Sequence, residues 1–430
     1  MRGNTVRIVP GGALFTAGRY DENGRVRGLL TPSIFISAGE ASGEHYGALL
    51  AAALRRQLSA QGQQARFFGM GGARMEAAGL ECIVPAEKMC VMGLTEVLLH
   101  LPQIWRELKR LKEAIRQRRP AVAILIDFPD LHFRIAAECH RLGIPVIFFV
   151  SPQLWAWKKH RIKLVRKYVD RMLVIFPFEE PYYRERGVEA EFVGHPLAEL
   201  PPPAIRRADF AAAHGLDPEQ QWIGLLPGSR EKEIRAILPE TLRAAVLLFH
   251  DFCLEKGNPE PQFLLPLAPT LTAEQRRWVA EMVAAQAENL TIRLVDDARA
   301  VLHHARASVV ASGTATLEAA LIGNPFVVVY RVSALTFAMA KRLVKVDHVA
   351  MANLIAGKRV VPELIQDDFN ATNIVQQIEP LLEESSARQT MISELARIHG
   401  LLHAGRTTGG AIERVAQVTL EVIAQGGFSG

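Results

Sequence analysis

Residues 307 to 331, ASVVASGTATLEAALIGNPFVVVYR, contain one complete strand–helix–strand unit. An apolar run ends in Ser312, Gly313 and Thr314, and a helical run with a single acid, Glu318, leads into a second apolar run. This pattern is typical of the βαβ unit of a parallel sheet, whose ligands bind at the carboxyl ends of the strands. Because the first N–H groups of a helix favour negative charge, the turn predicts an anionic ligand.

The same alternation of short apolar runs and helical runs extends over most of the chain. Before the unit come SIFIS from Ser33, ARFFGM, AVAILID and IPVIFFV, and later QFLLPLAP and LTIRLVD, with helical runs between them. The proline-rich stretch 199 to 215 interrupts this alternation, which then starts again. The sequence predicts an α/β fold with two doubly wound, Rossmann-like domains facing a central cleft. The expected segments are an extension (1–32), two domains (33–200 and 201–385) and C-terminal helices (386–430).

Composition limits the class of protein. The chain has 430 residues, 49% of them hydrophobic and 22% charged, which suits a folded protein of two domains. Lys plus Arg exceed Asp plus Glu by 50 − 45 = 5, which favours anionic partners without choosing among them. The four cysteines have no CxxC spacing, and no run is apolar enough for a signal peptide or a membrane span. We therefore expect reduced cysteines and a cytosolic protein.

A second candidate anion site lies in GLLPGSREKEI, residues 224 to 234. Gly228, Ser229 and Arg230 fall between a strand and a helix, where free N–H groups and a guanidinium can hold a diphosphate. An ordinary turn with a surface arginine fits this short motif equally well. The second turn at 312 to 314 favours the diphosphate interpretation.

Glu318 follows Thr314 by one helical turn and can point to the same side as the anion turn. A carboxylate there suits hydrogen bonding to two ribose hydroxyls. The alternative is a favourable charge near a helix N-terminus, worth about 0.3–1 kcal/mol. The chain has neither a Walker GxxxxGK[ST] motif nor a clear GxGxxG, which argues against ATP hydrolysis and dinucleotide binding. A sugar nucleotide fits better.

The first half has its own glycine-rich turn, SAGEASGEHYG, residues 37 to 47. Glu40 and Glu44 make this turn a poor phosphate site and a better one for sugar hydroxyls or an ammonium group. In the alternative interpretation, Ser42 caps the following helix and Glu44 lies in its first turn.

AILIDFPDLHF, residues 123 to 133, ends an apolar strand at Asp127. An acid at the carboxyl end of a central strand is partly buried, which raises its pKa and suits it to general-base work. The alternative is a helix N-cap, which is more plausible for Asp130 than for Asp127. The spacing is not the DxD of metal-dependent glycosyltransferases, so no divalent ion is implied.

Three basic segments carry aromatic or apolar residues: 104 to 119, 151 to 171 and 335 to 346. We interpret them as basic helices. They are either solvated helix faces or a surface for phosphate-bearing lipid, and charge alone does not separate these two interpretations. Binding to nucleic acid is a further alternative for the same residues. His195, in FVGHP, is interpreted as a structural residue rather than as an acid or ligand, because it stands alone.

Taken in order, SAGEASGE, FFGMGGARMEAAGLE, DFPD, VSPQLWAW, FPFEEPYY, FVGHPL, LLPGSR, SGTATLE and NLIAGKRVVPELIQ resemble the lipid-A-disaccharide synthase family. The resemblance runs from about Ser33 to about Asp368. The family's first turn usually reads GEASGD, so Glu44 is one methylene longer in this chain. A proline is replaced before Asn353, and the C-terminal part follows the family only loosely.

The resemblance implies a GT-B fold and an inverting glycosyltransferase. UDP-2,3-diacylglucosamine would donate its sugar to 2,3-diacylglucosamine 1-phosphate, giving a β-1,6-linked disaccharide phosphate and UDP. Asp127 is similar to the family's general base and Glu40 to its companion, and no metal or cofactor is implied. The residues that the resemblance implies for substrate binding are Gly39, Ser42, Gly43, Gly228, Ser229, Arg230, Ser312, Gly313, Thr314, Glu318 and Asn353.

Because both substrates carry acyl chains, the resemblance implies peripheral contact with the cytoplasmic face of the inner membrane and no nucleic-acid partner. The C-terminal helices are expected to pack on the domains or on a second subunit, so a homo-oligomer stays open. Two rivals share the UDP turns. A UDP-N-acetylglucosamine 2-epimerase would need acids and a histidine for proton chemistry, and a silent UDP-sugar-binding module would tolerate loss of Asp127.

Overall fold

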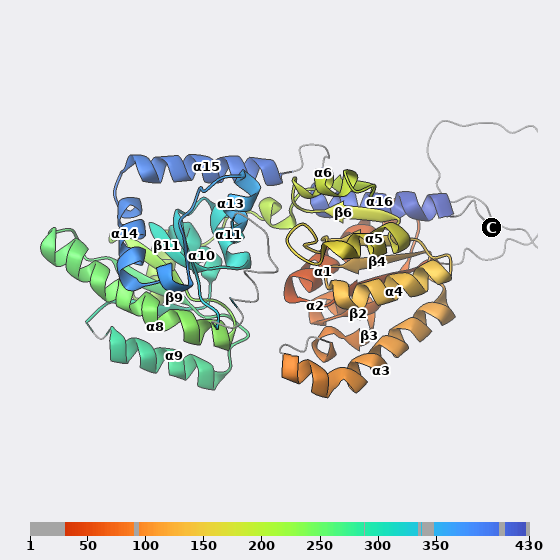
Figure 1. The fold of residues 1–430 in the computed structure, drawn as a ribbon, viewed down its shortest axis with the longest axis horizontal. Helices are drawn as coiled ribbons and strands as arrows, with labels where there is room; N and C mark the ends of the chain where they lie inside the picture. Colours follow the sequence, from red (N-terminus) through yellow and green to blue (C-terminus); the bar gives the residue numbers. More distant parts are fainter. Residues whose placement is uncertain are drawn as a thin grey trace, which may run out of the picture. The chain divides into compact units, whose positions relative to one another are not determined.

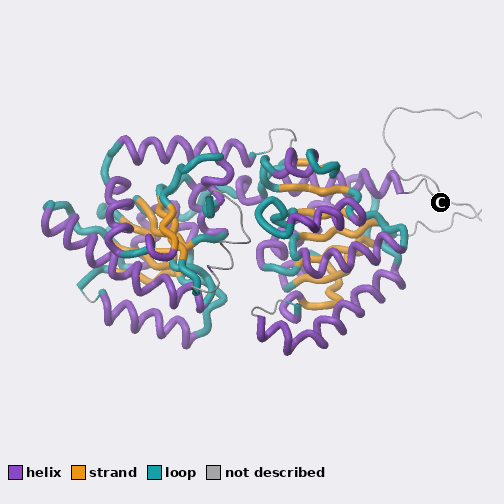
Figure 2. Tube along the Cα trace, in the orientation of Figure 1, coloured by secondary structure: helices purple, strands orange, loops and turns teal. Residues whose placement is uncertain are grey.

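The computed structural model describes residues 31–89, 94–287, 289–333, 337, 348–403 and 409–426. These residues form two compact units, one made of 31–196 with 409–426 and the other of Leu197–His403. In each unit helices cover both faces of one parallel sheet (Figures 1 and 2). The predicted pair of doubly wound, Rossmann-like domains is confirmed.

The first unit holds a sheet of seven strands in the order β3-β2-β1-β4-β5-β6-β7, with every neighbouring pair parallel. The central strand β4 is buried along its whole length, because helices cover it from both sides. The strands are β1 (Ser33–Ala38), β2 (Arg66–Gly71), β3 (Leu80–Pro85), β4 (Val122–Ile126), β5 (Val146–Phe149), β6 (Arg171–Val174) and β7 (Ala190–Phe192).

Two layers of helices cover this sheet. On one face α1 packs against α2 and α16, and on the other α4 packs between α3 and α5. Alternate residues of the strands supply the core: Phe35, Ala123 and Leu125 pack with apolar residues of α3 and α4. The helical segments are α1 (Ala41–Ala60), α2 (Ala73–Ala77), η1 (Ala86–Lys88), α3 (Leu94–Arg118), α4 (Pro129–Arg141), η2 (Lys159–Arg161), α5 (Ile162–Tyr168), α6 (Glu179–Arg184) and α16 (Ala411–Gly426).

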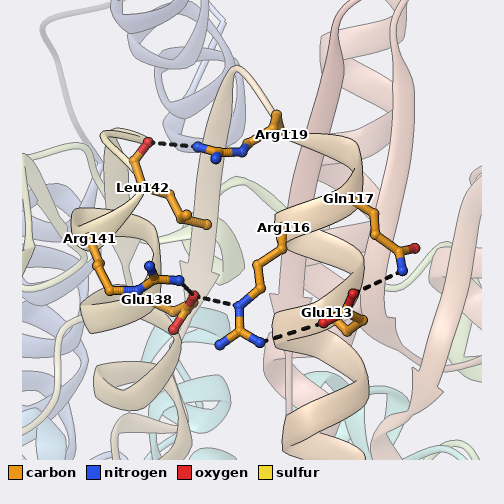
Figure 3. Close-up of polar contacts among 7 residues, drawn as sticks. All are labelled: Glu113, Arg116, Gln117, Arg119, Glu138, Arg141 and Leu142. Carbon is orange, nitrogen blue, oxygen red and sulfur yellow. Dashed lines mark hydrogen bonds and ion pairs between the residues drawn. The ribbon is translucent and has the colours of Figure 1, made fainter.

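An ion-pair cluster joins α3 to α4 (Figure 3). Arg116 donates from Nε to Oε1 of Glu138 over 2.9 Å, and Arg141, one turn along α4, pairs with the same oxygen. Glu113 accepts more weakly from Arg116, at 3.5 Å. The Glu138 side chain is only 8% exposed. The hydrogen bond from Arg116 outweighs the effect of burial, and together with Arg141 it lowers the pKa of Glu138 to about 2.

We expect Glu138→Gln to lower the free energy of unfolding by about 1–3 kcal/mol at neutral pH. The folded pKa lies below the ordinary carboxyl value, so the ionised group stabilises the fold above about pH 4.5 and loses this effect as the pH falls toward about 2. The difference between variant and parent should therefore narrow as the pH is lowered from about 5 to about 3. Urea titrations at both pH values measure it. Glu113→Gln is the control, with an expected change below about 0.5 kcal/mol, and a constant difference at both pH values would contradict the prediction.

The second unit holds a sheet of six parallel strands in the order β10-β9-β8-β11-β12-β13. On one face α8 packs against α9 and α14, and on the other α11 packs against α10, α13 and α15. The strands are β8 (Trp222–Leu226), β9 (Gln262–Pro266), β10 (Ile292–Val295), β11 (Ala307–Ala311), β12 (Phe326–Tyr330) and β13 (Glu363–Ile365). The helical segments are η3 (Pro196–Glu199), α7 (Arg207–His214), α8 (Glu231–Leu248), the π-helical η4 (Phe249–Glu255), α9 (Ala273–Gln286), α10 (Ala298–His304), α11 (Thr314–Ile322), α13 (Met351–Ala356), η5 (Gln366–Asp368), α14 (Ala371–Leu382) and α15 (Ser386–Leu402).

In each sheet the strand order reverses direction at one point. In the first unit this point lies between β1 and β4, and in the second between β8 and β11. Ligands of doubly wound proteins bind where the turns after two such strands diverge to opposite faces. The four turns singled out in the sequence follow these four strands.

Several expectations differ from the structure in detail. The division falls between Pro196 and Leu197, just before the predicted boundary, and the predicted terminal helices split, since α15 belongs to the second unit and α16 to the first. The segment 151–171 is not one basic helix, because Lys158 has a left-handed backbone (φ 49°) and only 159–168 is helical. The predicted helix at 335–346 lies outside the described residues apart from residue 337, and so does the extension up to residue 30.

Candidate active site

The turn after β1 brings Gly39 and Glu40 to the start of α1. Glu40 occupies the N-cap position, with extended backbone and no side-chain capping bond, so the alternative interpretation of Ser42 as the cap is wrong. Glu44 lies in the first turn of α1, as predicted, and its Oε1 accepts a hydrogen bond from the backbone N–H of Arg74 at 2.8 Å. Glu44 thereby caps the short helix α2 rather than its own helix.

The turn after β4 contains two successive residues with left-handed backbone, Asp127 (φ 53°) and Phe128 (φ 52°). Such conformations are rare outside glycine and concentrate at functional sites. Phe128 is the N-cap residue of α4, and its ring lies over Gly39. A Cβ atom on Gly39 would approach Phe128 Cγ to 2.4 Å, so only glycine lets the two turns approach this closely.

Asp127 and Asp130 differ sharply in environment. Burial, and then the negative charge of Glu40, raise the pKa of Asp127 to about 6. A hydrogen bond from the Phe128 N–H lowers this pKa, but its effect is smaller. Burial alone would also raise the pKa of Asp130, but the hydrogen bond and charge of Arg161 and the charge of Lys158 hold it below its usual value. Asp130 is the second residue of α4, so neither aspartate is an N-cap. Asp127 has the properties of a general base near neutral pH.

In the second unit, the two anion turns line one pocket of about 330 Å³. It brings together the residues predicted from the turns after β8 and β11: Gly228, Ser229, Arg230, Ser312, Gly313, Thr314 and Glu318. Its other polar or turn residues, which the sequence analysis did not single out, are Glu233, Pro266, Pro269 and Asp296. Glu233 lies on α8, within the stretch 224–234, and Pro266 is the last residue of β9. Pro269 and Asp296 lie after β9 and β10, where no local motif marks them.

Both helices that start at this pocket have uncapped N-termini. Arg230 is the N-cap residue of α8 and Gly313 that of α11, and neither makes a side-chain capping bond. The first N–H groups of each helix therefore favour an anion. The Arg230 guanidinium is 56% exposed and donates to Glu233 at 3.0 Å, a surface pair that a phosphate oxygen can displace at little cost.

Glu318 lines the pocket one helical turn after Thr314, as predicted. Burial raises the pKa of Glu318, and the nearby Arg299 opposes this effect. Glu318 and Arg299 also line a smaller cavity of about 240 Å³, together with His303 and His399. A half-buried carboxylate beside a pocket of this size suits paired hydroxyls, which donate hydrogen bonds to it.

Asn353 lines neither of these pockets. It is fully buried, its Nδ2 donates to the Val361 carbonyl and to Glu363, and its Oδ1 accepts from the N–H groups of Val360 and Val361. All of its hydrogen-bonding groups are thus used within the unit. Unlike the other predicted residues of this unit, Asn353 orders a backbone segment next to β13 in this structure.

His195 is 2% exposed and packs against Phe176 at 5.4 Å and Tyr46 at 6.3 Å between ring centres. Burial lowers its pKa to about 3, so the ring is neutral at physiological pH. This environment agrees with a structural residue.

Glu179, a buried acid at the first position of α6, was not expected from the sequence. It accepts hydrogen bonds from Ser151 Oγ at 2.6 Å, from Trp155 Nε1 at 3.2 Å and from the Phe176 N–H at 3.2 Å. Burial raises its pKa to about 7. These bonds fix the aromatic loop after β5. The acid within FPFEE could have suggested such a role, but nothing local indicates its partners.

One group of potential metal ligands occurs among the described residues: His250, Asp251 and Glu255, with ligand atoms within 4.8 Å of one another. It lies on η4, and none of its members lines either pocket. Within the described ranges, no helix combines the length and apolar character needed to cross a membrane.

The two doubly wound, parallel-sheet domains define a fold of the GT-B class. It resembles the UDP-GlcNAc 2-epimerase of Neisseria meningitidis bound to UDP-GlcNAc, with a TM-score of 0.57 and 12% identity over 90% of this chain and 100% of that one. It also resembles CalG4, the calicheamicin glycosyltransferase, with a TM-score of 0.56 and 16% identity over 92% of this chain and 99% of that one. At such identities the likeness shows the fold alone.

Sequence comparison gives the family. The family described as lipid-A-disaccharide synthetase matches residues 34–407. The chain is 58% identical to a lipid-A-disaccharide synthase of Acidobacterium capsulatum, over 91% of this chain and 96% of that protein. It is 48% identical to a lipid-A-disaccharide synthase of Koribacter versatilis, over 90% of this chain and 98% of that protein. The chain belongs to the lipid-A-disaccharide synthase family of glycosyltransferases.

Proposed function

We propose that the protein transfers the sugar of UDP-2,3-diacylglucosamine to 2,3-diacylglucosamine 1-phosphate, forming the β-1,6-linked lipid A disaccharide 1-phosphate and UDP. The observation that carries this proposal is the pocket of the second unit, in which both anion turns and Glu318 meet, in a chain that belongs to this family.

UDP binds in the second unit. Its diphosphate is held by the N–H groups of the turns at 228–230 and 312–314 and by the Arg230 guanidinium, and its ribose hydroxyls by Glu318. As the bond between the sugar and UDP breaks, negative charge grows on the departing phosphate. Arg230 and the two helix N-termini stabilise that charge.

Asp127 acts as the general base. Its carboxylate takes the proton from the acceptor's 6-hydroxyl as that oxygen attacks the anomeric carbon from the face opposite UDP, so one displacement inverts the configuration. Glu40 raises the pKa of Asp127 through its charge and so brings the base closer to the working pH. Gly39, Ser42 and Gly43 line the acceptor side in this proposal.

Peripheral contact with the cytoplasmic face of the inner membrane gives access to both acylated substrates. Its support is the basic helix α3, on which Trp105 is 53% exposed beneath the Arg134 guanidinium, 4.6 Å from the ring centre. Trp157, 42% exposed beside Lys158, adds a second aromatic and basic pair. Exposed indole rings next to cations suit the headgroup region of an anionic bilayer.

We expect Trp105→Ser to weaken binding to phosphatidylglycerol vesicles about 3- to 10-fold, because burial of an indole ring at the interface is lost. Cosedimentation with the vesicles measures the change. Trp278→Ser is the matched control, since Trp278 also lies beneath an arginine, Arg235 at 4.4 Å, but on α9 of the second unit. If the Trp105→Ser and Trp278→Ser variants bind the vesicles equally well, α3 does not take part in the proposed membrane contact.

A detergent-micelle assay with both substrates tests the reaction. Purified protein is incubated without added metal, with EDTA in a parallel tube, and disaccharide phosphate and UDP are measured. Product that depends on the acceptor and survives EDTA is expected. If no disaccharide forms and a separate incubation with UDP-N-acetylglucosamine yields its 2-epimer, the alternative of an epimerase-like enzyme is favoured. UDP binding without turnover in either incubation would favour a silent binder.

A further inference from the structure

His132, on the first turn of α4, is fully buried and joins two strands of the first sheet. Its Nε2 lies 2.9 Å from the hydroxyl oxygen of Ser37, on β1. Its Nδ1 hydrogen-bonds to the backbone carbonyl oxygen of Asp127, at the end of β4. The ring packs edge-on against Phe128 and Phe148, at 5.9 and 6.0 Å between ring centres. His132 therefore lies beneath the turn that presents Asp127.

The partners of His132 determine its protonation. Burial lowers the pKa of His132 to about 4, so the ring is neutral at physiological pH and carries a single N–H. The carbonyl oxygen of Asp127 can only accept, so the hydrogen must be on Nδ1. Nε2 is then the acceptor, and the Ser37 hydroxyl donates to it. Both polar atoms of the buried ring are satisfied, in one tautomer only.

The bond to the Asp127 carbonyl acts on an unfavourable backbone. Asp127 has left-handed φ, which a non-glycine residue keeps only where its surroundings enforce it. Its N–H donates to the Phe149 carbonyl at 3.0 Å, and its C=O accepts from His132. Hydrogen bonds thus fix the peptide groups on both sides of the Asp127 Cα. Because the Cα–Cβ bond is rigidly attached to this backbone, they also set the direction in which the carboxylate points.

We propose that His132 is a positioning residue of the transferase: as a neutral imidazole, it holds the Asp127 backbone so that the carboxylate is presented as the base. The inference rests on the proposed function, in which Asp127 takes the acceptor's proton. A core that needed only volume could use leucine at this position. The two hydrogen bonds, to different elements, give His132 a role that leucine cannot supply.

Three substitutions separate the two bonds of His132. In His132→Asn the amide nitrogen can occupy the place of Nδ1 and donate to the Asp127 carbonyl, whereas the longer His132→Gln reaches only toward Ser37. His132→Leu removes both bonds. We expect kcat within about threefold of the parent for the Asn variant and about 10- to 100-fold lower for the Gln and Leu variants, as positioning effects predict. The KM of the donor and the Kd of UDP should stay unchanged in all three.

Two results would overturn the proposal. One is full kcat in the Leu variant. The other is an equal loss of kcat in the Asn and Gln variants when both remain folded. The second comparison stands even where the Leu variant fails to fold, because both amides are polar and fit near the same volume. Ser37→Ala leaves the bond to Asp127 in place, so we expect its kcat to fall less than that of the Gln variant.

A stability measurement tests the positioning without activity. Asp127→Asn relieves the cost of a buried charge, and at pH 8 we expect it to raise the Tm of the parent. In the His132→Asn background the gain should persist, and in the His132→Gln background it should fall to less than half, because the released carboxylate can turn to solvent. An equal gain in all backgrounds would overturn the proposal. A parent enzyme that makes no disaccharide would overturn the proposed function instead, and would leave this result intact.

Discussion

Replacing Asp127 by asparagine is expected to lower kcat of the transferase about 10³-fold while leaving the Kd of UDP unchanged. The size follows from the contribution of a positioned general base, about 10²–10⁴-fold. UDP affinity should persist because Asp127 belongs to the first unit, whereas the proposed UDP pocket is lined by residues of the second. Disaccharide formation in micelles and isothermal titration with UDP measure the two quantities.

The same substitution is expected to stabilise the protein. The folded pKa of Asp127 is raised to about 6 from 3.8, so its ionisation costs stability progressively as the pH rises from about 4 to above 6. The uncharged asparagine avoids this cost, worth about 1–3 kcal/mol at pH 8. Asparagine also tolerates left-handed backbone better than most residues. A loss of turnover with a higher Tm separates loss of a base from misfolding.

The pH dependence follows from the same carboxylate. A base must be ionised, so kcat/KM of the parent should fall about tenfold per pH unit below about pH 6. Glu40→Gln removes the negative charge that helps to raise this pKa, and we expect the acidic limb to move to lower pH. Near-normal turnover by Asp127→Asn, or an acidic limb that Glu40→Gln moves upward, would contradict the assignment of Asp127 as base.

Replacing Arg230 by alanine is expected to lower kcat/KM for the donor about 10²- to 10³-fold and to weaken UDP binding at least tenfold. Hydrogen bonds between charged groups contribute about 1.5–3 kcal/mol each, and the guanidinium can make two to a diphosphate. The charge on the phosphate grows as the sugar leaves, so the loss in turnover should exceed the loss in affinity for UDP. Arg230→Lys should recover part of the turnover and part of the UDP affinity, since lysine keeps the positive charge but lacks the planar, two-pronged guanidinium.

Arg243 offers a matched control for Arg230. It lies on the same helix, α8, is 64% exposed, and pairs with Glu240 three residues away, just as Arg230 pairs with Glu233. It lines neither pocket. Arg243→Ala should therefore leave turnover and UDP affinity unchanged. If both variants lose activity equally, the effect comes from α8 itself and not from a diphosphate contact.

Much of this architecture could be read from local patterns. The unit at 307–331 appears in the structure as β11, α11 and β12, with the turn 312–314 opening the helix. Long apolar runs between helical ones identified the central strands. The strands β3, β6, β7 and β13 were not singled out. Strands β6, β7 and β13 have only three or four residues, and β3 (LECIVP) carries Glu81 among partly exposed positions, so the apolar signal of each is weak.

The candidate base and the candidate phosphate-binding residues could also be predicted from the sequence. Asp127 follows an apolar run, and Gly228 to Arg230 precede a helix, so position along the chain already suggests their chemistry. Asn353, by contrast, was expected in the cleft through the family resemblance, and the structure shows its amide engaged by residues 360, 361 and 363. The environment of a buried amide depends on contacts that a motif does not record.

The amino-acid sequence by itself determined the elements and the chemical character of their turns, because hydrophobic period, glycine and helix-start residues act within a few positions. Only the tertiary structure decided which turns meet. Strand order places β1 beside β4 and β8 beside β11, and so brings Glu40 near Asp127 and Arg230 near Ser312. It also places Ser37 against His132, and Ser151 and Trp155 against the buried Glu179. These contacts arise from pairing and packing between segments that are distant in the sequence, and local sequence patterns do not reveal which distant segments will meet.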